Sequence, residues 1–383
     1  MGIVAFLLCL FLVAPSADAL AAQPAAPIVI GGLFAQTGTA AAIGKPAKHV
    51  AELAVEQINH MGGVLGRPMR LVVCDTASTP AVAVRQARRL IEEEHVSALI
   101  GPVSLESGQA VRKFAEEKHV PLLLPMAESA GDPAAWTFVA AQRTDAVVAK
   151  ILEYLRGKNI KKIGILYTKN AFGQDGLGAF RADAGTYGVS VAGAEAFEPA
   201  GGNVAPQAGK VQAAGPQAAV VWAMGPDGAL AAKTLASLNG GRPLLVQSHV
   251  QAGPEYLKQA GGMAGGTVLP ATRLLVPETL ADEDPQKLVI EAFLKAYEQN
   301  VDRKKYPVTI VSGYVYDAVL VLRAAMQQAK SADPSAVRDA LEHLQGVVGV
   351  SGVYNFSSQE HNGLRADSLI MLIVDSGRYK LAP

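Results

Sequence analysis

The sequence predicts an α/β protein with two doubly wound lobes, each built on a parallel sheet. Short β-branched runs alternate with amphipathic helical runs from residue 28 to residue 269, and small-residue turns stand where strands pass into helices. The 383 residues, half of them hydrophobic and only 18% charged, suffice for two domains with large cores. These three observations favour two α/β lobes with large buried cores over disorder.

The first cycle of strands and helices is predicted between residues 28 and 124. Its first helix carries apolar or small residues at the 3–4 spacing of a buried stripe, with Pro46 in the first turn and Gly62-Gly63 after the last. The predicted strands are 28–33, 69–74, 97–100 and 121–124, and the predicted helices are 46–60, 81–95 and 107–118.

A second cycle of similar size follows residue 141, and a mostly helical part ends the chain. That last part holds only one late strand, so we expect it to be shared between the two lobes. The second cycle comprises helices 145–156, 174–183, 204–214 and 227–238 and strands 162–167, 189–194, 218–223, 244–246 and 267–269. The final part comprises helices 286–299, 308–329 and 334–344 and strand 369–374.

Residues 1–22 are interpreted as a secretory signal peptide, which predicts export to the periplasm. The apolar run at residues 3–13 is too short to span a bilayer, and Ala-Asp-Ala at 17–19 fits a cleavage site, although Lys and Arg are absent before the run. Removal of Cys9 with the signal leaves Cys74 alone at the end of an apolar strand, where we expect inert core packing.

Charge and motifs argue against nucleic-acid binding and against catalysis. The 34 basic residues balance the 34 acidic ones, and the seven histidines show no metal-ligand spacing. H-E-x-x-H, C-x-x-C, G-x-S-x-G and G-x-x-x-x-G-K-[ST] are all absent. The acidic cluster 282–284 precedes a helix, whose dipole explains it. We therefore expect no enzyme activity, no cofactor, no metal, no nucleic-acid partner and no membrane span in the mature chain.

Several motifs, in order, resemble the periplasmic leucine/isoleucine/valine-binding family of ABC-transporter receptors over nearly the whole mature chain. Each motif is weak by itself, but their order and spacing together are specific. They are GxxxxTGxxAxxG (32–44), IN-x-x-GG-x-x-G-R-P (58–68), IGPVS (100–104), VPLLLP (120–125), KKIGILYTKNAFGQDG (161–176) and VVWAMGPDGALAAK (220–233).

The resemblance implies two Rossmann-like lobes joined by three crossing segments, with the ligand in the cleft between them. The crossings map near Gln142–Thr144, Ala271–Arg273 and Gly352–Asn355, which makes Arg143 and Thr144 hinge residues. Arg143 either anchors the hinge or reaches a ligand carboxylate. The N-terminal lobe is then 27–141 plus 272–352, and the C-terminal lobe is 142–271 plus 353–383.

The resemblance also implies ligand contacts in the first lobe. Relatives that bind amino acids use a serine after the glycine turn, and Ser104 lies in or beside that position, whereas strict register places Leu105 there. Their P-[AG]-A-[ST] loop corresponds to residues 125–128, where Glu128 replaces the hydroxyl. Pointing inward, Glu128 would favour an amine or hydroxyl on the ligand; otherwise it is a helix N-cap or a solvated loop charge. Ile43 replaces an aromatic residue.

In the second lobe, Phe172 matches the aromatic lid, and His249 falls where an acidic residue pairs with the ammonium. Trp222 and Met224 end a strand and either line the cleft or belong to the core, and His249 is otherwise an ordinary loop histidine. The predicted ligand contacts are thus Ile43, Ser104, Leu105, Met126, Ala127, Glu128, Phe172, Trp222, Met224 and His249.

These departures predict a ligand with a carboxylate and an apolar or aromatic body, because an unpaired buried ammonium is costly. A carboxylate could pair with His249 or accept hydrogen bonds at helix starts. The leading hypothesis is a periplasmic receptor that closes on its ligand and docks on an ABC permease, and the resemblance implies a monomer. The alternatives are a receptor for branched-chain or other amino acids, and a periplasmic sensor of an amide or another metabolite.

Overall fold

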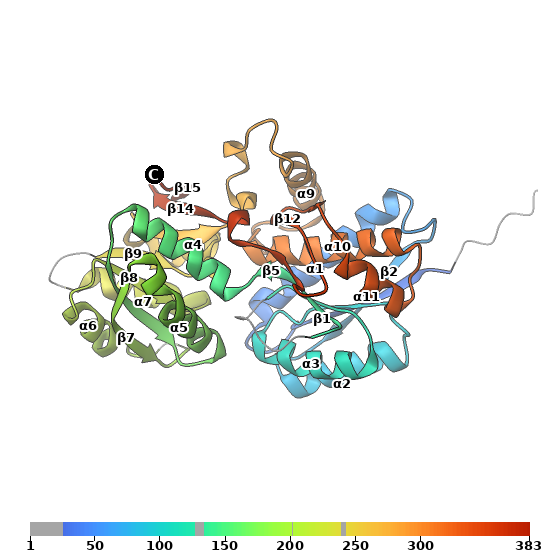
Figure 1. The fold of residues 1–383 in the computed structure, drawn as a ribbon, viewed down its shortest axis with the longest axis horizontal. Helices are drawn as coiled ribbons and strands as arrows, with labels where there is room; N and C mark the ends of the chain where they lie inside the picture. The colour runs from blue at the N-terminus through green and yellow to red at the C-terminus, as the bar shows by residue number, and fades with distance from the viewer. Residues whose placement is uncertain (1–25, 127–133, 201, 239–242) are drawn as a thin grey trace, which may run out of the picture.

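The protein was analysed as a computed structural model that describes residues 26–126, 134–200, 202–238 and 243–383. Two sheets flanked by helices form two lobes that lie side by side along the longest axis of the molecule (Figure 1). The predicted fold class is confirmed. The predicted signal peptide lies outside the described residues.

The first lobe contains a six-stranded sheet whose neighbouring strands are all parallel. Alternate strand residues point to opposite faces, so Leu99 and Leu122 pack towards α2 and α3, and their successors Ile100 and Leu123 towards α1 and α10. The strand order is β13 (Asn362–Leu364), β5 (Thr137–Gln142), β4 (Leu122–Leu124), β3 (Leu99–Ile100), β1 (Ile28–Phe34), β2 (Met69–Asp75). The helices are α1 (Ala41–His60), α2 (Pro80–Glu92), α3 (Leu105–Lys118), α9 (Lys287–Asn300), α10 (Ile310–Ala329) and α11 (Pro334–Glu342).

The second lobe contains a seven-stranded sheet with two antiparallel strands at one edge, β14 and β15. Helices α4 and α5 cover one face of this sheet, and α6, α7 and α8 cover the other. The order is β15 (Arg378–Leu381), β14 (Ile370–Asp375), β10 (Val268–Ala271), β9 (Leu244–Gln247), β8 (Ala218–Trp222), β6 (Lys162–Thr168), β7 (Ser190–Phe197). The helices are α4 (Thr144–Gly157), α5 (Ala171–Asp183), α6 (Ala205–Ala213), α7 (Gly225–Ser237) and α8 (Pro254–Ala260).

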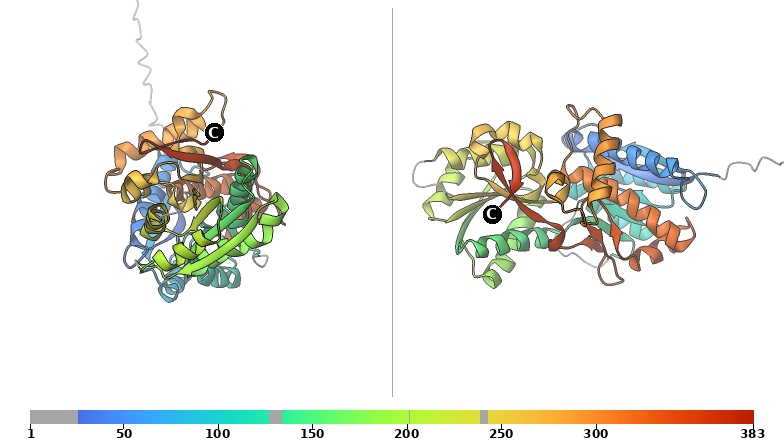
Figure 2. Two further views of the ribbon diagram at one scale, coloured as in Figure 1. Left: turned by 90° about the vertical axis from the view of Figure 1, so that its left-hand side faces the viewer. Right: turned by 90° about the horizontal axis from the view of Figure 1, so that it is seen from above.

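The chain passes between the two sheets directly after β5, directly after β10 and between β13 and β14. The third crossing therefore lies at residues 365–369 instead of the predicted 352–355, because β13 still pairs with β5 in the first sheet. Residues 353–364 accordingly lie with the first lobe, where β12 (Val353–Tyr354) pairs with β11 (Val347–Val348). Figure 2 shows the last strands, in red, returning to the second lobe.

Several boundaries differ from those predicted. Helix α1 begins at Ala41, so Pro46 lies inside it, and α5 begins at Ala171, which places Phe172 in its first turn. The early start of α1 is possible because Gly44 lies against the backbone of Ala35, the residue after β1, where a Cβ would be 2.0 Å from the Ala35 oxygen. Strand β5 was not predicted; its TFVAAQ sequence is almost wholly buried and lacks polar alternation.

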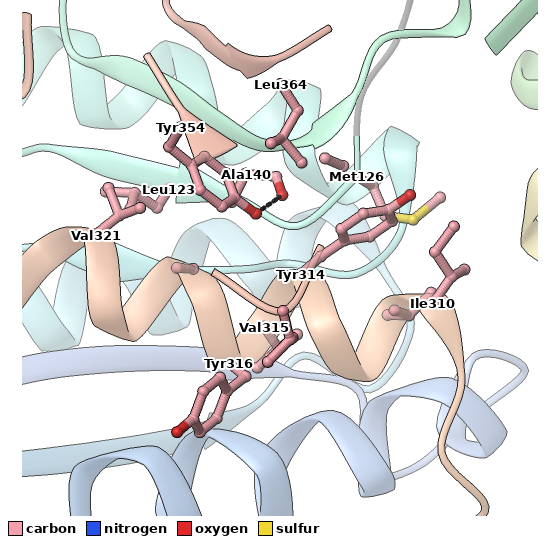
Figure 3. Close-up of a cluster of buried hydrophobic side chains, with 14 of the residues drawn as sticks. Leu123, Met126, Ala140, Ile310, Tyr314, Val315, Tyr316, Val321, Tyr354 and Leu364 are labelled. Carbon is pink, nitrogen blue, oxygen red and sulfur yellow. Dashed lines mark hydrogen bonds between the residues drawn. The ribbon is translucent and has the colours of Figure 1, made fainter. Parts of the chain in front are cut away.

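Helix α10 runs through the core of the first lobe and connects it to the crossings. Figure 3 shows the Met126 side chain beside the ring of Tyr314, which belongs to α10. The Tyr314 hydroxyl donates to Oε1 of Gln142, in the first crossing, and Nε2 of Gln142 donates to Oγ of Ser368, in the third, at 2.7 Å. Arg273, in the second crossing, donates to the carbonyl oxygen of Ser368 at 3.5 Å. One hydrogen-bond network, buried at Gln142 and Tyr314, thus joins all three crossings.

Candidate ligand-binding site

The residues selected from the sequence lie where parallel strands end and helices begin. Ser104 and Met224 are the N-cap residues of α3 and α7, and Trp222 is the last residue of β8. Ligands of open parallel sheets bind at this carboxyl edge. The two edges approach each other, because α3 contacts α5 and α10 contacts the short helix η2 (His249–Gln251) of the second lobe.

The TG turn after β1 is held by Asp75, a residue that the sequence analysis did not select. The Asp75 carboxylate accepts hydrogen bonds from the Thr37 hydroxyl at 2.7 Å and from the backbone N–H groups of Gln36 and Ala77, both at 2.8 Å. Partial burial raises the pKa of Asp75, but these hydrogen bonds outweigh it and leave the pKa below its usual value. Asp75 is therefore ionised, and its carboxylate holds the turn that precedes α1. The sequence feature that could have identified Asp75 is its position at the end of a strand.

The start of α3 is the polar part of the site. Ser104 is extended and makes no side-chain cap, so the N–H groups of the first helical turn lack this partner. Ser107, in that first turn, is only 1% exposed, and its Oγ has no hydrogen-bond partner among the described residues. Leu105 begins the helix and is half-buried. An uncapped helix start beside a buried free hydroxyl suits an anionic group.

The other first-lobe residues that were predicted to contact the ligand either pack against the core or lie outside the described residues. Met126 is 5% exposed and packs on Tyr314 in the core, as Figure 3 shows. Ile43 lies in the first turn of α1, half-buried against the same core. Ala127 and Glu128 lie outside the described residues.

The second-lobe residues form an aromatic cluster at the ends of β8 and β9. The rings of Phe172 and Trp222 stack with centroids 5.5 Å apart and planes 18° apart, and Phe180 meets Trp222 edge-on at 5.6 Å. Phe172 is 4% exposed, whereas Trp222 is fully buried. The structure therefore brings Phe172, Trp222 and His249 together, with Trp222 beneath the other two.

His249 is neutral in this cluster. Its ring centroid lies 6.3 Å from that of Phe172 and 6.1 Å from that of Trp222, and its Nδ1 has no hydrogen-bond partner among the described residues. Burial lowers the pKa of His249 to about 4, because the apolar surroundings disfavour the imidazolium. His249 thus has a neutral ring with a buried, unpartnered Nδ1 and carries no preformed positive charge.

Three polar side chains that the sequence analysis did not select hold the turn next to His249. Gln251 donates through Nε2 to the carbonyl oxygens of Ala223 and Gly225, at 3.2 and 3.0 Å, and Ser248 donates to Ala223 at 2.8 Å. Gln247 donates to the Gly228 carbonyl at 2.9 Å. These bonds connect the end of β9 to the start of α7, where Met224 is half-buried. The available signal was the polar run QSHVQ after a buried strand.

The start of α5 is satisfied by its own segment of chain. Asn170 caps the helix by accepting a hydrogen bond from the N–H of Gly173 at 3.0 Å, and the Thr168 hydroxyl donates to the same Asn170 oxygen at 3.0 Å. The Asn170 cap thus satisfies one donor in the first turn of α5, the turn that also carries Phe172.

The predicted hinge residues lie in the first crossing. Arg143 pairs with Asp145 in its own segment and, at 3.6 Å, with Glu360 of the first lobe. Arg143 also lines an open hollow of about 430 Å³ between α4 and the third crossing. Thr144 is buried, and its hydroxyl has no partner among the described residues. This geometry joins the lobes at a surface distinct from the aromatic cluster.

The parts of the chain that the structure describes contain no group of three or more His, Cys, Asp or Glu side chains placed to hold a metal ion. No helix among them is long and apolar enough to cross a bilayer.

Two lobes with facing carboxyl edges, joined by three crossings, define the class of two-lobed ligand-binding proteins. Residues 27–378 match the family described as periplasmic binding protein, and the chain belongs to that family. The resemblance to leucine/isoleucine/valine-binding proteins is confirmed: Leu/Ile/Val-binding protein homolog 3 of Brucella melitensis is 26% identical, over 92% of this chain and 93% of that protein. BraC3 of Rhizobium johnstonii, a Leu/Ile/Val-binding protein, is 26% identical over 83% of this chain and 84% of its own length.

Solved structures agree with the fold. An extracellular ligand-binding receptor from Rhodopseudomonas palustris has a TM-score of 0.84 and 27% identity, covering 94% of this chain and 99% of its own. The Streptococcus pneumoniae branched-chain amino acid binding protein LivJ, solved with isoleucine, has a TM-score of 0.77 and 24% identity, with coverage of 92% and 98%. At this level of identity, the likeness to LivJ supports the fold alone.

Proposed function

We propose that this protein is the periplasmic receptor of an ABC importer and captures a small carboxylate with an apolar or aromatic body. One observation carries the proposal. The first lobe presents an uncapped helix start with the buried, unpartnered Ser107 hydroxyl, and α3 contacts α5, where the second lobe presents Phe172. A polar head and an apolar body therefore have separate binding surfaces.

The ligand carboxylate would accept hydrogen bonds from the first turn of α3 and from Ser107, where the helix dipole favours negative charge. The body would lie against Phe172 beside His249. An α-ammonium group has a weaker case, because the position of its acidic partner in relatives holds His249, which is neutral and buried. Desolvating an ammonium without a counter-charge costs more than the hydrogen bonds return.

Thermal-shift assays with matched ligand pairs test this proposal on the purified mature protein. L-phenylalanine is compared with 3-phenylpropanoate, and L-leucine with 4-methylpentanoate, so each pair differs only by the ammonium group. The acid should raise the melting temperature more than its amino acid, since a ligand present at 100 times its Kd stabilises the folded state by about 2.7 kcal/mol. Shifts produced by the amino acids alone would contradict the proposal.

A receptor for branched-chain amino acids is the second candidate, and the curated relatives favour it because their names describe Leu/Ile/Val binding. The same pairs separate the two candidates, since this reading expects L-leucine to outperform 4-methylpentanoate. Under it, an acidic group would have to face the ammonium.

The proposal includes capture without chemistry, a monomer, and delivery to a permease after export. Closure of the lobes would make contacts from both lobes simultaneous, and the closed form would be the one that the permease recognises. Mass spectrometry of the bound acid after prolonged incubation should recover it unchanged, whereas a converted product would contradict a pure receptor.

A further inference from the structure

Trp222 is fully buried, so it can influence a ligand only through the residues that it contacts. The side chain has no exposed surface, yet it contacts the residues to which the ligand body is assigned. Its indole Nε1–H donates to the carbonyl oxygen of Phe172 at 3.1 Å, and its ring stacks under the Phe172 ring. Phe180 meets the indole edge-on. Phe172 and Phe180 of α5 therefore both pack on the indole.

Helix α5 is shaped to admit this indole. Gly176 lies one turn after Phe172, and a Cβ there would be 2.2 Å from Nε1 of Trp222. Glycine inside a helix costs about 1 kcal/mol relative to alanine. The neighbouring Gly178 has open space around its Cα, so the same helix contains one glycine that the indole requires and one that it does not.

We propose that Trp222 is a positioning residue that sets the separation of Phe172 and His249, and thereby the fit of the ligand body, without touching the ligand. The proposal rests on the function proposed above. The Nε1–H···O bond fixes the first turn of α5, the stack fixes the plane of the Phe172 ring, and the packing keeps His249 at the end of β9. Phenylalanine at position 222 would retain an apolar ring but lose the hydrogen bond and part of the stack.

The main experiment measures binding of 3-phenylpropanoate by isothermal titration calorimetry for wild type, Trp222→Phe, Gly176→Ala and Gly178→Ala. Losing one hydrogen bond and one aromatic contact should raise the Kd about tenfold in Trp222→Phe. Gly176→Ala should act in the same direction because it displaces the indole, and Gly178→Ala should bind as wild type. An unchanged Kd in folded Trp222→Phe, whatever its melting temperature, would overturn the proposal.

A ligand-free measurement keeps the inference separate from the proposed function. NMR titration of the His249 ring protons in wild type and Trp222→Phe reports whether Trp222 holds and shields that ring. A His249 titration displaced toward the ordinary range in the variant supports the positioning role even if no probe binds. Superimposable titrations would overturn it.

Fluorescence adds a readout that a purely structural role would not produce. The chain has two tryptophans, and Trp136 lies in the first lobe against His119 and Arg338. In a Trp136→Phe background, emission comes from Trp222 alone. Binding of 3-phenylpropanoate should change it, because the ligand body would lie against Phe172 and His249, the two rings beside the indole. Constant emission across a titration in which calorimetry shows binding would count against the proposal.

Discussion

The starts of α3 and α5, two helices that contact each other across the lobes, are built in opposite ways. In the second lobe, Asn170 caps α5 and Thr168 supports the cap, so the helix start has a side-chain partner within the lobe, and Phe172 lies in its first turn. In the first lobe, Ser104 leaves α3 without a side-chain cap, and the hydroxyl of Ser107 is buried without a partner among the described residues. The start of α3 thus has polar groups without side-chain partners, whereas the start of α5 is capped and carries an aromatic residue.

This difference indicates how a two-lobed receptor can divide recognition. A buried polar group without a partner lowers the stability of the folded protein by about 1–3 kcal/mol. At a binding edge, a ligand that forms the missing hydrogen bond removes this cost. An internally capped edge carries no such cost and contributes through packing. We therefore expect variants in the first lobe to separate stability from binding, and variants in the second lobe to affect both together.

The largest effect is expected from Gly173→Ala in the second lobe. A Cβ at Gly173 would lie 1.7 Å from the carbonyl oxygen of Thr168, so the capped turn would have to open. We expect a loss of about 3 kcal/mol in the free energy of unfolding, measured by urea denaturation. Gly178→Ala, in open space on the same helix, is the control and should be neutral or slightly stabilising. Equal losses in both variants would show that helix glycines in general, and not this contact, set the stability.

The next effect is the loss of folding stability at acid pH, to which we expect His249 in the second lobe to contribute most. Its folded pKa of about 4 lies below the ordinary 6.5, so the unfolded chain takes up a proton first as pH falls. Stability contributed by neutral His249 is present above pH 6.5 and is lost between pH 6.5 and 4, by up to about 3 kcal/mol. In His249→Gln, denaturation curves across this range should show a shallower decline. A decline identical to wild type would remove His249 from the explanation.

The first lobe contains a buried group of the opposite sign. Asp317 on α10 accepts hydrogen bonds from the N–H groups of Val350 and Ser351 at 2.7 and 2.8 Å and from the Tyr354 hydroxyl at 3.1 Å. Burial raises the pKa of Asp317 from 3.8 to about 6, against these hydrogen bonds. The folded state therefore takes up the proton first, and the Asp317 term stabilises the protein as pH falls from 6 to 4.

Asp317→Asn should remove that stabilising term, of somewhat under 3 kcal/mol at most, and so steepen the decline of stability with acid. The measurement is the same set of urea curves used for His249→Gln. The two variants should change the slope in opposite directions, and a change in the same direction would refute the assignment of signs to the two lobes.

Much of the fold follows from local pattern, because alternating strands and helices and the order of the turn motifs are sequence properties. What escaped prediction depends on pairing between distant segments. Strand β13 has three residues and forms only beside β5, so neither it nor the third crossing has a local signature. Strand β5, buried on both faces, shows no alternation.

The site divides in the same way. The positions of Phe172 and His249 at strand ends follow from the motif order, because the carboxyl edge is where strand–helix turns lie. The burial of Trp222 against Phe172 and the lack of a partner for the Ser107 hydroxyl arise from tertiary packing. Neither feature could be predicted from the sequence, because periodicity and motifs do not show which polar atoms lack hydrogen-bond partners.

The smallest effect is the most direct comparison of the two edges, made with Ser107→Ala and Asn170→Ala. Removing the unpartnered Ser107 hydroxyl should raise the free energy of unfolding by about 1 kcal/mol, whereas removing the Asn170 cap should lower it by about 1 kcal/mol. Urea denaturation without ligand measures both values. The affinity for 3-phenylpropanoate should fall in Ser107→Ala in spite of its greater stability, because the carboxylate loses a donor.

Opposite signs for stability and affinity in Ser107→Ala are what distinguish a binding group from a structural one. In Asn170→Ala both quantities should fall together, because the cap holds the turn from which Phe172 projects. If Ser107→Ala instead lost stability, its hydroxyl would have a structural partner, and the two edges would be alike. If it gained stability with unchanged affinity, the carboxylate would bind elsewhere on the α3 turn, and the division of recognition would then depend on backbone donors alone.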